Sequence, residues 1–524
     1  MKNKIYIPLL FSVAIVLGII IGTKLNFSNR NTMSFFNKNP QEVKIKRLID
    51  YIQYDYVDKV DTDSLLDGAI GNILEKLDPH SVYIPASEHG AINERMNGEF
   101  VGIGIQFRIY KDSLVVIKVI ADGPSEEAGV KAGDRILIAN KDTLYNKGRN
   151  NEYVFKTLKG TSKTKVDLKI YRKSEHKFLN FIIKRGQIPI ESVDAVYMLN
   201  DSLGYIRINK FASTTYKEFK TGLSSLLDQN MRHLVLDLRG NPGGYLDIAT
   251  QIVDEFLEDD KLIVFTKNKG GKIDKSFATN KGSFEDGKIY VLIDENSASA
   301  SEIVAGALQD NDKGVIVGRR SFGKGLVQQE MSLGDGSAVR LTVSRYYTPT
   351  GRSIQKPYDG DSNNYYNDRL MRIHNGELVS ADSIKVNDSL RYVTPKGKVV
   401  YGGGGIVPDV FVGIDTTAYF GRFHFESMSN FVFEYIDNHR KDVETWSSLN
   451  FDANFAKEEL LQHYLTSIRR KTNKTKKTYL RRYLRALFAR QLFDETLFYK
   501  ILNEDDKVLN KVLELEKQPI LAPH

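Results

Sequence analysis

The sequence predicts a multi-domain α/β protein with an apolar N-terminal segment, an inserted β-rich segment and a helical C-terminal region. Three observations support this prediction. Strand-like and helical runs alternate over residues 188–417, short strand-like runs follow one another over residues 98–187, and the chain beyond residue 418 is helical and highly charged. At 524 residues, the chain has room for roughly two to four domains and at least one large core.

The N-terminus has the features of a membrane-spanning segment. Lys2 and Lys4 precede Ile5–Gly22, a stretch of 18 residues without a charge, which is near the lower length limit for crossing a bilayer. We therefore expect residues 1–26 to form an uncleaved single-pass anchor in the cytoplasmic (inner) membrane, with the rest of the chain facing the periplasm or the cell exterior. A cleavable signal peptide is the alternative, although no small-x-small cleavage site follows Gly22 directly.

Residues 27–97 are expected to form a polar linker followed by helices. The apolar pattern from Glu42 onward predicts two helices that are interrupted near Asp58–Asp63, where Asp61 or Asp63 can cap the second helix. A turn at residues 77–81 ends this helical part.

The predicted secondary structure changes at Gly98 and again near Gln187. Between these positions, β-rich runs separated by turns indicate a compact domain with one or two short helices. Beyond Gln187, strands alternate with helices, which is typical of an α/β core with partly parallel strands. The predicted strands are residues 233–239, 288–295 and 313–320, and the predicted helices are residues 216–229, 246–257 and 301–310.

Charge and cysteine content limit the kinds of binding partner and active site that the chain can have. The formal charge is +8, yet residues 469–490 alone contain ten Lys or Arg and no acid, so the rest of the chain is close to neutral. A nucleic-acid or anionic-surface binder would therefore depend on one short segment. The absence of cysteine excludes a thiol nucleophile, a disulfide framework and a cysteine-ligated metal.

The basic segment also carries apolar side chains at helical spacing. Residues 477–493 predict an amphipathic helix with a cationic face. Three interpretations are open: a helix packed on the protein, contact with an anionic membrane surface, and binding of a partner. Burial of the aromatic stripe would favour the packed helix.

The stretch from Glu295 to Glu330 holds the strongest chemical signal. Ser297, Ser299 and Ser301 alternate with other residues at the start of a predicted amphipathic helix. Unpaired N–H groups and the helix dipole favour negative charge at such a position, so it suits an oxyanion as well as a cap.

A nucleophilic serine also needs a base to accept its proton. His80 and His89 are the local histidine candidates, but no G-x-S-x-G motif accompanies them. Lys324 is the alternative, because it lies between two glycines and its apolar neighbours would desolvate it and lower its pKa. The residues alone leave a Ser-His-Asp triad and a Ser-Lys dyad open.

This stretch closely resembles the catalytic signature of the carboxy-terminal processing peptidases, or tail-specific proteases, which are serine proteases with a Ser-Lys dyad and a PDZ domain. The likeness extends over about residues 40–412 in the family's order. Its further motifs are LDPHSVYI (77–84), GEFVGIGIQF (98–107), PSEEAGVKAGDRILIAN (124–140), LVLDLRGNPGG (234–244), YYTPTGRSIQ (346–355) and GGGGIVPDV (402–410).

The resemblance implies a domain organisation. It implies a ClpP/crotonase-like α/β protease core at residues 188–417, to which residues 27–97 add a linker and an N-terminal helical part, and an inserted PDZ domain at residues 98–187. The helical, basic region at residues 418–524 matches no motif shared with the family, so its role stays open.

The resemblance also implies roles for single residues. The family places its lysine 25 positions after the serine, which selects Ser299 together with Lys324. Gln328 matches the glutamine that orients the lysine. The oxyanion would be held by the N–H of Ala300 and by one from the glycine loop, with Gly243 and Gly244 as the two candidates.

PDZ domains add the C-terminus of a peptide as an extra strand and hold its carboxylate on backbone N–H groups. In this chain the resemblance assigns that loop to Val101, Gly102, Ile103 and Gly104, with Ile103 and Ile105 near the pocket for the terminal side chain. The implied partners are protein or peptide substrates with free C-termini, and the membrane through the N-terminal helix. A homo-oligomer or an activating partner is also compatible with the resemblance.

These observations predict a serine endopeptidase that recognises exported proteins and cleaves them near their C-termini. No metal, other cofactor or nucleic acid is implied. The alternative is a catalytically silent PDZ scaffold that binds peptides at the cell envelope, but the presence of Ser299, Lys324 and Gln328 argues against it.

Overall fold

The computed structural model describes residues 11–17, 39–416, 422–448, 451, 455, 459–469 and 472–517. The chain forms two compact units, residues 1–73 and 74–524. The N-terminal helices are α2 (Pro40–Asp55) and α3 (Thr62–Glu75). The Asp61 side chain accepts hydrogen bonds from the N–H groups of Asp63 and Ser64, which confirms the predicted interruption and the cap at Asp61.

The predicted membrane anchor is not supported. Of the predicted span Ile5–Gly22, the structure describes residues 11–17, which are helical and exposed, whereas residues 5–10 and 18–22 lie outside the described part of the chain. Among the described residues, no helix is long and apolar enough to cross a bilayer, which takes about 20 residues. The prediction of a single-pass protein of the cytoplasmic membrane, with the rest of the chain facing the periplasm or the cell exterior, is therefore wrong.

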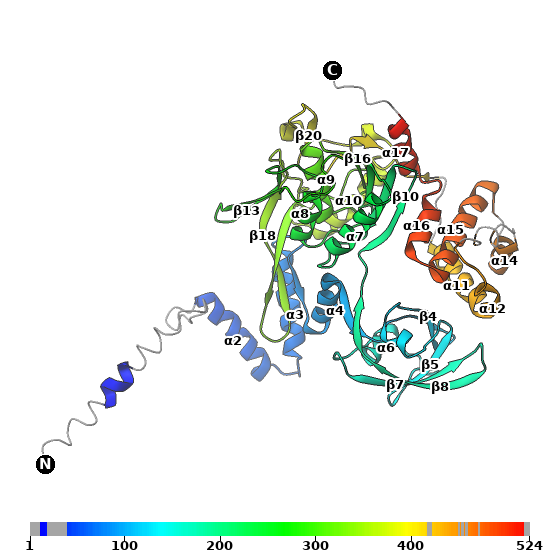
Figure 1. The fold of residues 1–524 in the computed structure, drawn as a ribbon. Coiled ribbons are helices and arrows are strands. Elements are labelled where there is room, and N and C mark those ends of the chain that lie inside the picture. Colours follow the sequence, from blue (N-terminus) through cyan, green and yellow to red (C-terminus); the bar gives the residue numbers. More distant parts are fainter. Residues whose placement is uncertain are drawn as a thin grey trace, which may run out of the picture. The chain divides into compact units, whose positions relative to one another are not determined.

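A six-stranded sheet forms the centre of the second unit (Figure 1). Its strands lie in the order β10 (Val193–Met198), β11 (Leu203–Ile208), β12 (His233–Asp237), β15 (Lys288–Ile293), β16 (Gly314–Gly318) and β21 (Val410–Phe411). The β10–β11 pair is antiparallel and the other pairs are parallel. The helices between the strands are α7 (Thr215–Leu227), α8 (Leu246–Asp254) and α9 (Ala300–Asp310). The predicted α/β alternation is thus confirmed.

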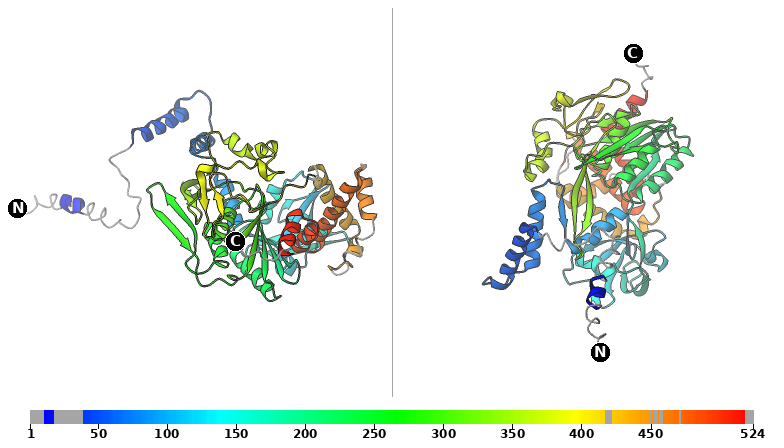
Figure 2. Two further views of the ribbon diagram at one scale, coloured as in Figure 1. Left: turned by 90° about the horizontal axis from the view of Figure 1, so that it is seen from above. Right: turned by 90° about the vertical axis from the view of Figure 1, so that its left-hand side faces the viewer.

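Both faces of this sheet are buried, which explains the continuous apolar runs of its strands. Leu234 and Val291 belong to the core that the sheet shares with α7, α8 and α9. Their neighbours Val235 and Tyr290 point to the opposite face and pack against α17 (Lys507–Lys517). The red C-terminal helices accordingly lie beside the green strands in Figure 1 and in both views of Figure 2.

A second, five-stranded sheet carries the loops that flank the candidate site. Its strands are β1 (Val82–Ile84), β13 (Leu262–Asn268), β14 (Ile273–Phe277), β17 (Leu326–Ser332) and β18 (Ala338–Tyr347), and all of its pairs are antiparallel. Strand β17 begins two residues after Lys324, and β1 follows the predicted turn at residues 77–81.

The β-rich segment forms its own sheet with its own apolar core. Its elements are β3 (Ile105–Tyr110), β4 (Ser113–Val119), α5 (Pro124–Glu127), β5 (Asp134–Ala139), β6 (Asp142–Thr143), α6 (Asn151–Leu158), β7 (Lys165–Arg172) and β8 (Lys177–Lys184). A two-stranded ribbon of β2 (Glu99–Gly102) and β9 (Gly186–Pro189) joins the chain where it enters and leaves this segment.

The remaining elements of this unit before residue 417 are helices and one hairpin outside the sheets described above. They are α4 (Ala86–Asn97), α10 (Ser362–His374), the 3-10 helices η1 (Ala381–Ser383) and η2 (Asp388–Leu390), and the hairpin of β19 (Arg391–Val393) and β20 (Val399–Tyr401).

The C-terminal region is helical, as predicted, and has a separate apolar core. Its helices are α11 (Arg422–Asn438), α12 (Arg440–Val443), α14 (Glu459–Ser467), α15 (Lys474–Leu492) and α16 (Glu495–Asn503). Helix α15 contains the predicted amphipathic segment, and Leu480, Leu484 and Phe488 of its apolar stripe are buried in that core. Arg482 and Arg485 form ion pairs with Asp505 and Glu504. The structure therefore agrees with the packed-helix interpretation of this segment.

Candidate active site

The serine cluster lies at the junction between β15 and α9, as the sequence predicts. Every residue of α9 is buried, so the helix has a fixed place in the core. Ser299 directly precedes α9 and has φ 55° and ψ −113°, a conformation that non-glycine residues rarely adopt. Such strain costs on the order of 1–3 kcal/mol and persists only where the surroundings hold it, which is typical of functional positions.

The three serines have different surroundings. Ser297 and Ser301 are fully buried, and their hydroxyls donate to the carbonyl oxygens of Leu238 and Asn241 at 2.8 and 3.0 Å. Ser299 is partly exposed and lines a cleft. Only Ser299 of the three is therefore placed to meet a substrate.

Lys324 lies on the loop that joins β16 to β17, and the two glycines beside it allow close backbone packing. A Cβ on Gly323, which has φ +90°, would come within 3.1 Å of the Gly405 nitrogen, and one on Gly325 within 2.9 Å of the Gln355 nitrogen. Burial, and then the charge of Arg340, lower the pKa of Lys324 to about 8, against the opposing charge of Glu302.

The buried carboxylate of Glu302 joins the serine loop to the lysine loop. Its Oε2 accepts hydrogen bonds from the N–H groups of Ser299 and Lys324, both at 2.8 Å. Its Oε1 accepts one from the Gly323 N–H at 2.7 Å and one from the Ser321 hydroxyl at 2.5 Å. Burial raises the pKa of Glu302, and these donors oppose the shift.

Tyr346 of β18 adds a second link between the same loops. Its hydroxyl lies 2.8 Å from the carbonyl oxygen of Lys324 and 3.1 Å from that of Ser299. Sequence reasoning missed both Tyr346 and Glu302. The S-x-x-E spacing from Ser299 is a capping-box signal that could have identified Glu302, whereas no local pattern points to Tyr346.

Gln328 lies on β17 and lines the same cleft as Ser299 and Lys324. Its Nε2 donates to the Thr342 hydroxyl at 3.3 Å, and that hydroxyl donates to Asp78 at 3.2 Å. The amide of Gln328 is therefore oriented with its Nε2 toward Thr342. Asp78 belongs to the LDPHSVYI motif, so the structure links this motif through Thr342 to Gln328 in the cleft.

The glycine loop after β12 lies against Ser299. A Cβ on Gly243 would come within 2.8 Å of the Ser299 Cβ and 2.9 Å of the Ala300 nitrogen, so only glycine fits there. The N–H of Gly243 donates to the Asn241 side chain at 2.8 Å. In the described part of the chain, the N–H groups of Gly244 and Ala300 have no hydrogen-bond partner. Of the two glycines, Gly244 thus has the N–H group that is not already engaged.

A cleft of about 420 Å³ collects these groups. It is lined by the predicted residues Gly243, Gly244, Ser299, Lys324 and Gln328 and by Asn93, Met96, Pro242, Tyr245, Leu246, Ile303, Leu326, Val327, Glu330, Arg340 and Tyr346. Ala300, the other predicted oxyanion residue, is buried beside Ser299. Among the described residues, no cluster of His, Asp and Glu is suited to hold a metal ion.

The two candidate histidines are engaged elsewhere. His80 contacts the Tyr365 hydroxyl at 2.9 Å, and burial, followed by the charge of Lys324, lowers its pKa to about 4. His89 contacts Glu330 at 2.6 Å. Within the described residues, neither histidine is hydrogen bonded to Ser299 and neither lines the cleft.

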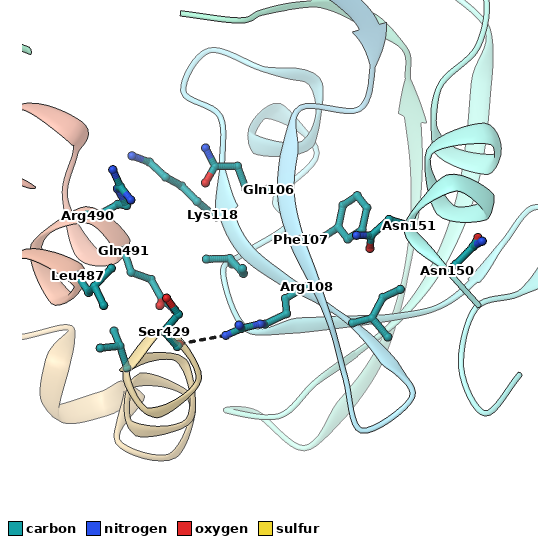
Figure 3. A pocket seen from close by; sticks show the side chains of 13 residues that line it. Gln106, Phe107, Arg108, Lys118, Asn150, Asn151, Ser429, Leu487, Arg490 and Gln491 are labelled. Carbon is teal, nitrogen blue, oxygen red and sulfur yellow. Dashed lines mark hydrogen bonds between the residues drawn. The ribbon is translucent and has the colours of Figure 1, made fainter. Parts of the chain in front are cut away.

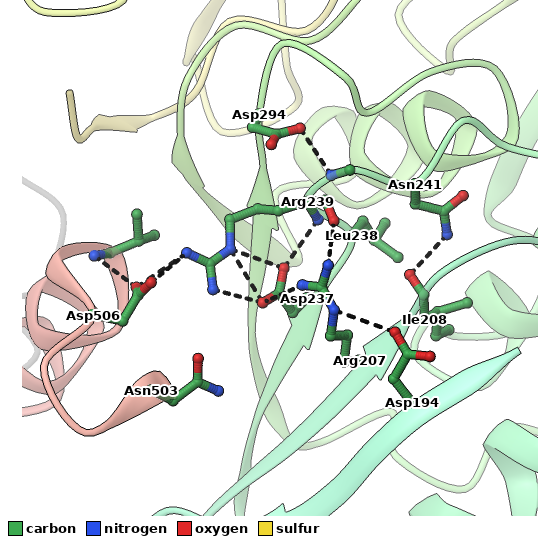
Figure 4. A network of polar contacts seen from close by, with 12 residues as sticks. Asp194, Arg207, Ile208, Asp237, Leu238, Arg239, Asn241, Asp294, Asn503 and Asp506 are labelled. Carbon is green, nitrogen blue, oxygen red and sulfur yellow. Dashed lines mark hydrogen bonds and ion pairs between the residues drawn. The ribbon is translucent and has the colours of Figure 1, made fainter. Parts of the chain in front are cut away.

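A buried ionic network lies at the end of β12, where the chain leads into the glycine loop (Figure 4). Asp237, at the end of β12, is bound by Arg239 at 2.6 Å and by Arg207 at 3.0 Å. Burial alone would raise the pKa of Asp237, but the two guanidinium groups hold it well below its usual range. Arg239 also pairs with Asp506 at 2.8 Å, so the C-terminal region is tied to the segment that leads into the glycine loop.

The predicted tail-binding residues lie at one edge of the β-rich segment. Gly102, Ile103, Gly104 and Ile105 line a small apolar pocket of about 30 Å³ beside α6, whereas Val101 lies outside it and pairs with Gln187. In the described part of the chain, the N–H groups of Ile103 and Gly104 have no partner, and β3 pairs on one side only, with β4. An open strand edge beside free N–H groups suits an added strand with a terminal carboxylate.

Comparison with known proteins identifies four matching families. Residues 202–361 match peptidase family S41, and residues 101–183 match the PDZ domain. Residues 23–87 match the activating protease CtpB N-terminal domain, and residues 424–494 match a family of unknown function, DUF8443.

Two curated relatives decide the family. The chain is 35% identical over 318 residues to the carboxy-terminal processing protease CtpB of Bacillus subtilis, with 60% of this chain and 65% of the relative covered. It is 34% identical over 360 residues to a probable CtpA-like serine protease of Staphylococcus aureus strain N315, with 68% and 71% covered. The chain belongs to the S41 carboxy-terminal processing peptidases.

Membership of this serine-type peptidase family confirms the resemblance and disfavours the silent scaffold. A solved structure of a photosystem II D1 C-terminal processing protease is 26% identical, with 70% of this chain and 86% of that chain covered and a TM-score of 0.36. The matched part spans about two thirds of the length of the curated relatives, 65% of CtpB and 71% of the CtpA-like protease.

Proposed function

We propose that this S41 peptidase is an endopeptidase that cleaves protein substrates near their C-termini with Ser299 as nucleophile and Lys324 as base. The main support for the proposal is that the Glu302 carboxylate accepts hydrogen bonds from the N–H groups of both Ser299 and Lys324, and that both residues line one cleft. A lysine whose pKa is about 8 has an appreciable neutral fraction near neutral pH, which a base requires.

The proposed reaction is acyl transfer. The neutral Lys324 Nζ accepts the proton of the Ser299 hydroxyl as its oxygen attacks the scissile carbonyl carbon. The resulting ammonium returns the proton to the leaving amine, and the acyl group stays on Ser299. Lys324 then accepts a proton from water as the water oxygen attacks the ester carbonyl carbon, and it returns this proton to the Ser299 oxygen when the ester bond breaks and the new C-terminus is released.

The oxyanion donors in this proposal are the N–H groups of Ala300 and Gly244. Both lack a hydrogen-bond partner in the described part of the chain, as expected of donors kept for charge that develops during the reaction. Gly243 then has a different role, because its lack of a side chain lets the carbonyl approach and its bond to Asn241 fixes the loop. Gln328 orients Lys324 through its amide oxygen, since its Nε2 donates to Thr342.

The proposed organisation keeps the divisions expected from the sequence. Residues 27–97 and 188–417 form the protease domain, and the six-stranded sheet with α7–α9 represents a ClpP/crotonase-like core. Residues 98–187 form the PDZ domain, whose open β3 edge binds the substrate tail and whose Ile103–Gly104 N–H groups hold its carboxylate. A homo-oligomer or an activating partner stays a prediction.

Cleavage of an unstructured protein with a free C-terminus tests this function. The full chain should release short C-terminal fragments, identified by intact-mass spectrometry, whereas the Ser299→Ala variant should release none. The Ser301→Ala variant, which changes a buried serine of the same cluster, is the matched control and should retain cleavage. Equal cleavage by wild type and Ser299→Ala would refute the assignment of the nucleophile.

A further inference from the structure

The C-terminal helices pack against one face of the β-rich segment through specific polar contacts. Arg108 of β3 donates to the Ser429 carbonyl oxygen at 3.0 Å, and Lys118 of β4 donates to the Phe493 carbonyl oxygen at 2.7 Å. The Tyr110 hydroxyl donates to Glu434 at 2.7 Å. These contacts place α11 and the end of α15 on β3 and β4. Among the described residues, β3 pairs only with β4, so its opposite edge is open.

A buried ion pair fixes the same contact. Asp437 accepts two hydrogen bonds from Arg135, at 2.6 and 2.8 Å, and one from Lys173 at 2.9 Å. A bidentate pair has a defined geometry, so the helices sit in one register on the strands.

A cleft of about 740 Å³ lies where the helices, β3 and the start of α6 meet. It is lined by Gln106, Phe107, Arg108, Ile109, Ile117, Lys118, Asn150, Asn151, Ser429, Val432, Leu487, Arg490 and Gln491. Among the described residues, this lining holds three cationic side chains and no carboxylate. Arg490 pairs with Glu495, whereas Arg108 and Lys118 donate to main-chain oxygens and have no ion pair among the described residues.

The side chains of β3 alternate between two faces, although Phe107 lines both this cleft and the tail pocket. Ile105, Phe107 and Ile109 pack on the core of the β-rich segment, so Gln106 and Arg108 point the other way. Figure 3 shows Gln106, Arg108 and Lys118 on the side of Ser429 and Arg490, while Phe107 points toward Asn151. Lys118 lies opposite Gln106 in the strand pair and shares its face.

We propose that the C-terminal helices extend the PDZ groove and select substrate tails with acidic residues just before the terminus. This inference rests on the proposed tail binding at β3. A tail added antiparallel to β3, with its last side chain in the pocket at Ile105, places its penultimate residue opposite Gln106 and its fourth-last residue opposite Arg108. Those two side chains point toward Arg108, Lys118 and the α15 residues, whereas the third-last points toward α6.

Peptide binding to the full-length Ser299→Ala chain tests the inference without cleavage. The probes are fluorescent ten-residue peptides that end in an apolar residue with a free carboxylate and carry Glu, Gln or Lys at the penultimate and fourth-last positions. We expect the Glu peptide to bind about threefold to tenfold more tightly than the Gln peptide, and the Lys peptide to bind more weakly. Glu at the third-last position is the matched control and should give no gain. The preference should shrink at high salt.

Two substitutions in α15 assign the preference to the C-terminal helices. Gln491→Glu puts a carboxylate into the cleft and should abolish or reverse the preference for Glu, and Arg490→Gln should reduce it. Lys476→Gln, which removes a charge from an exposed position of the same helix outside the cleft, should leave it unchanged.

The outcomes separate this inference from the proposed function. If the free-acid peptides bind better than amidated ones but Glu, Gln and Lys peptides bind alike, the inference is overturned and the tail-binding role stands. If the preference for Glu survives Gln491→Glu and Arg490→Gln, the role of the helices is overturned. If amidated and free-acid peptides bind equally, or none binds, both the tail-binding role and the inference fail.

Discussion

The cleft at Ser299 and Lys324 and the proposed tail groove on β3 differ in how their backbone N–H groups are engaged. Around Ser299 and Lys324, the N–H groups of both residues are bound by one buried carboxylate, which links the two loops. Along β3, one strand edge and the N–H groups of Ile103 and Gly104 are left without partners in the described part of the chain.

This difference matches the two roles in the proposed function. Bond cleavage needs reacting groups held in one arrangement before the substrate arrives, and the N–H groups of Ser299 and Lys324 are accordingly bound by Glu302, while those of Gly244 and Ala300 stay open for the proposed oxyanion. The proposed tail binding needs backbone groups that the ligand itself can satisfy, and the N–H groups of Ile103 and Gly104 meet this requirement in the described part of the chain. The two sites should therefore respond separately to substitution.

Loss of either dyad residue should have the largest effect. Ser299→Ala and Lys324→Ala should each lower kcat by at least about 10³-fold, and the double variant should be no worse, because the two residues act as one unit. Tail-peptide affinity should stay within about twofold of wild type. Ser297→Ala should retain activity and lose about 1–3 kcal/mol of unfolding free energy, since the buried hydroxyl bonds with the Leu238 carbonyl oxygen and the Asp294 N–H are lost. An inactive Ser297→Ala with an active Ser299→Ala would contradict the assignment.

Glu302→Gln should have the next largest effect. A neutral amide cannot accept the four hydrogen bonds that the carboxylate receives, so kcat/KM should fall by about 10²-fold while tail binding is retained. The negative charge of Glu302 also raises the pKa of Lys324, so the apparent pKa in the pH–rate profile should move downward. An unchanged profile would indicate that Glu302 has only a structural role.

Activity should depend on pH more steeply than tail binding does. Lys324 must be neutral to act as base, so kcat/KM should be lost as the pH falls through about 8. A group with this pKa predicts roughly a 20-fold rise between about pH 6.5 and 8.5. Because the folded pKa is below the unfolded value, the protonated lysine also destabilises the fold, and this cost is relieved as the pH rises above about 8. Activity that falls over this range in folded protein would exclude Lys324 as the base.

Amidation of the substrate C-terminus should give the smallest effect, confined to recognition. Removal of the terminal charge should weaken tail binding and raise KM about tenfold with little change in kcat, because in the proposed binding mode the open N–H groups of Ile103 and Gly104 contact the carboxylate and not the scissile bond. The measurement compares matched free-acid and amidated substrates at several concentrations. A loss confined to kcat would mean that the two regions are not independent.

Much of the candidate site could be predicted because its signals are local. The serine cluster, the lysine between two glycines and the apolar face of α9 all lie within residues 295–330, and the resemblance to the processing peptidases selected Ser299 among the serines by its spacing to Lys324. The α/β alternation, the cap at Asp61 and the amphipathic α15 were predictable for the same reason, since each depends on neighbours only a few residues apart.

The remaining features depend on residues that are far apart in the chain. Glu302 and Lys324 are 22 positions apart, and Tyr346 lies 47 positions after Ser299, so no periodicity links them. The choice between Gly243 and Gly244 depends on which N–H Asn241 engages, and both glycines look alike in sequence. The N-terminal prediction failed for a related reason: apolar composition alone does not establish a helix long enough to cross a bilayer.

The sequence by itself determined which side chains are available to the chemistry and which segments are strands or helices. Only the tertiary structure decided that Ser297 and Ser301 are buried and engaged while Ser299 faces a cleft, and that the C-terminal helices lie beside β3. The contact of the helices with β3 could not be predicted, because Arg108 and Lys118 bind the main-chain carbonyl oxygens of Ser429 and Phe493. Every residue has such an oxygen, so a partner of this kind leaves no mark in the sequence.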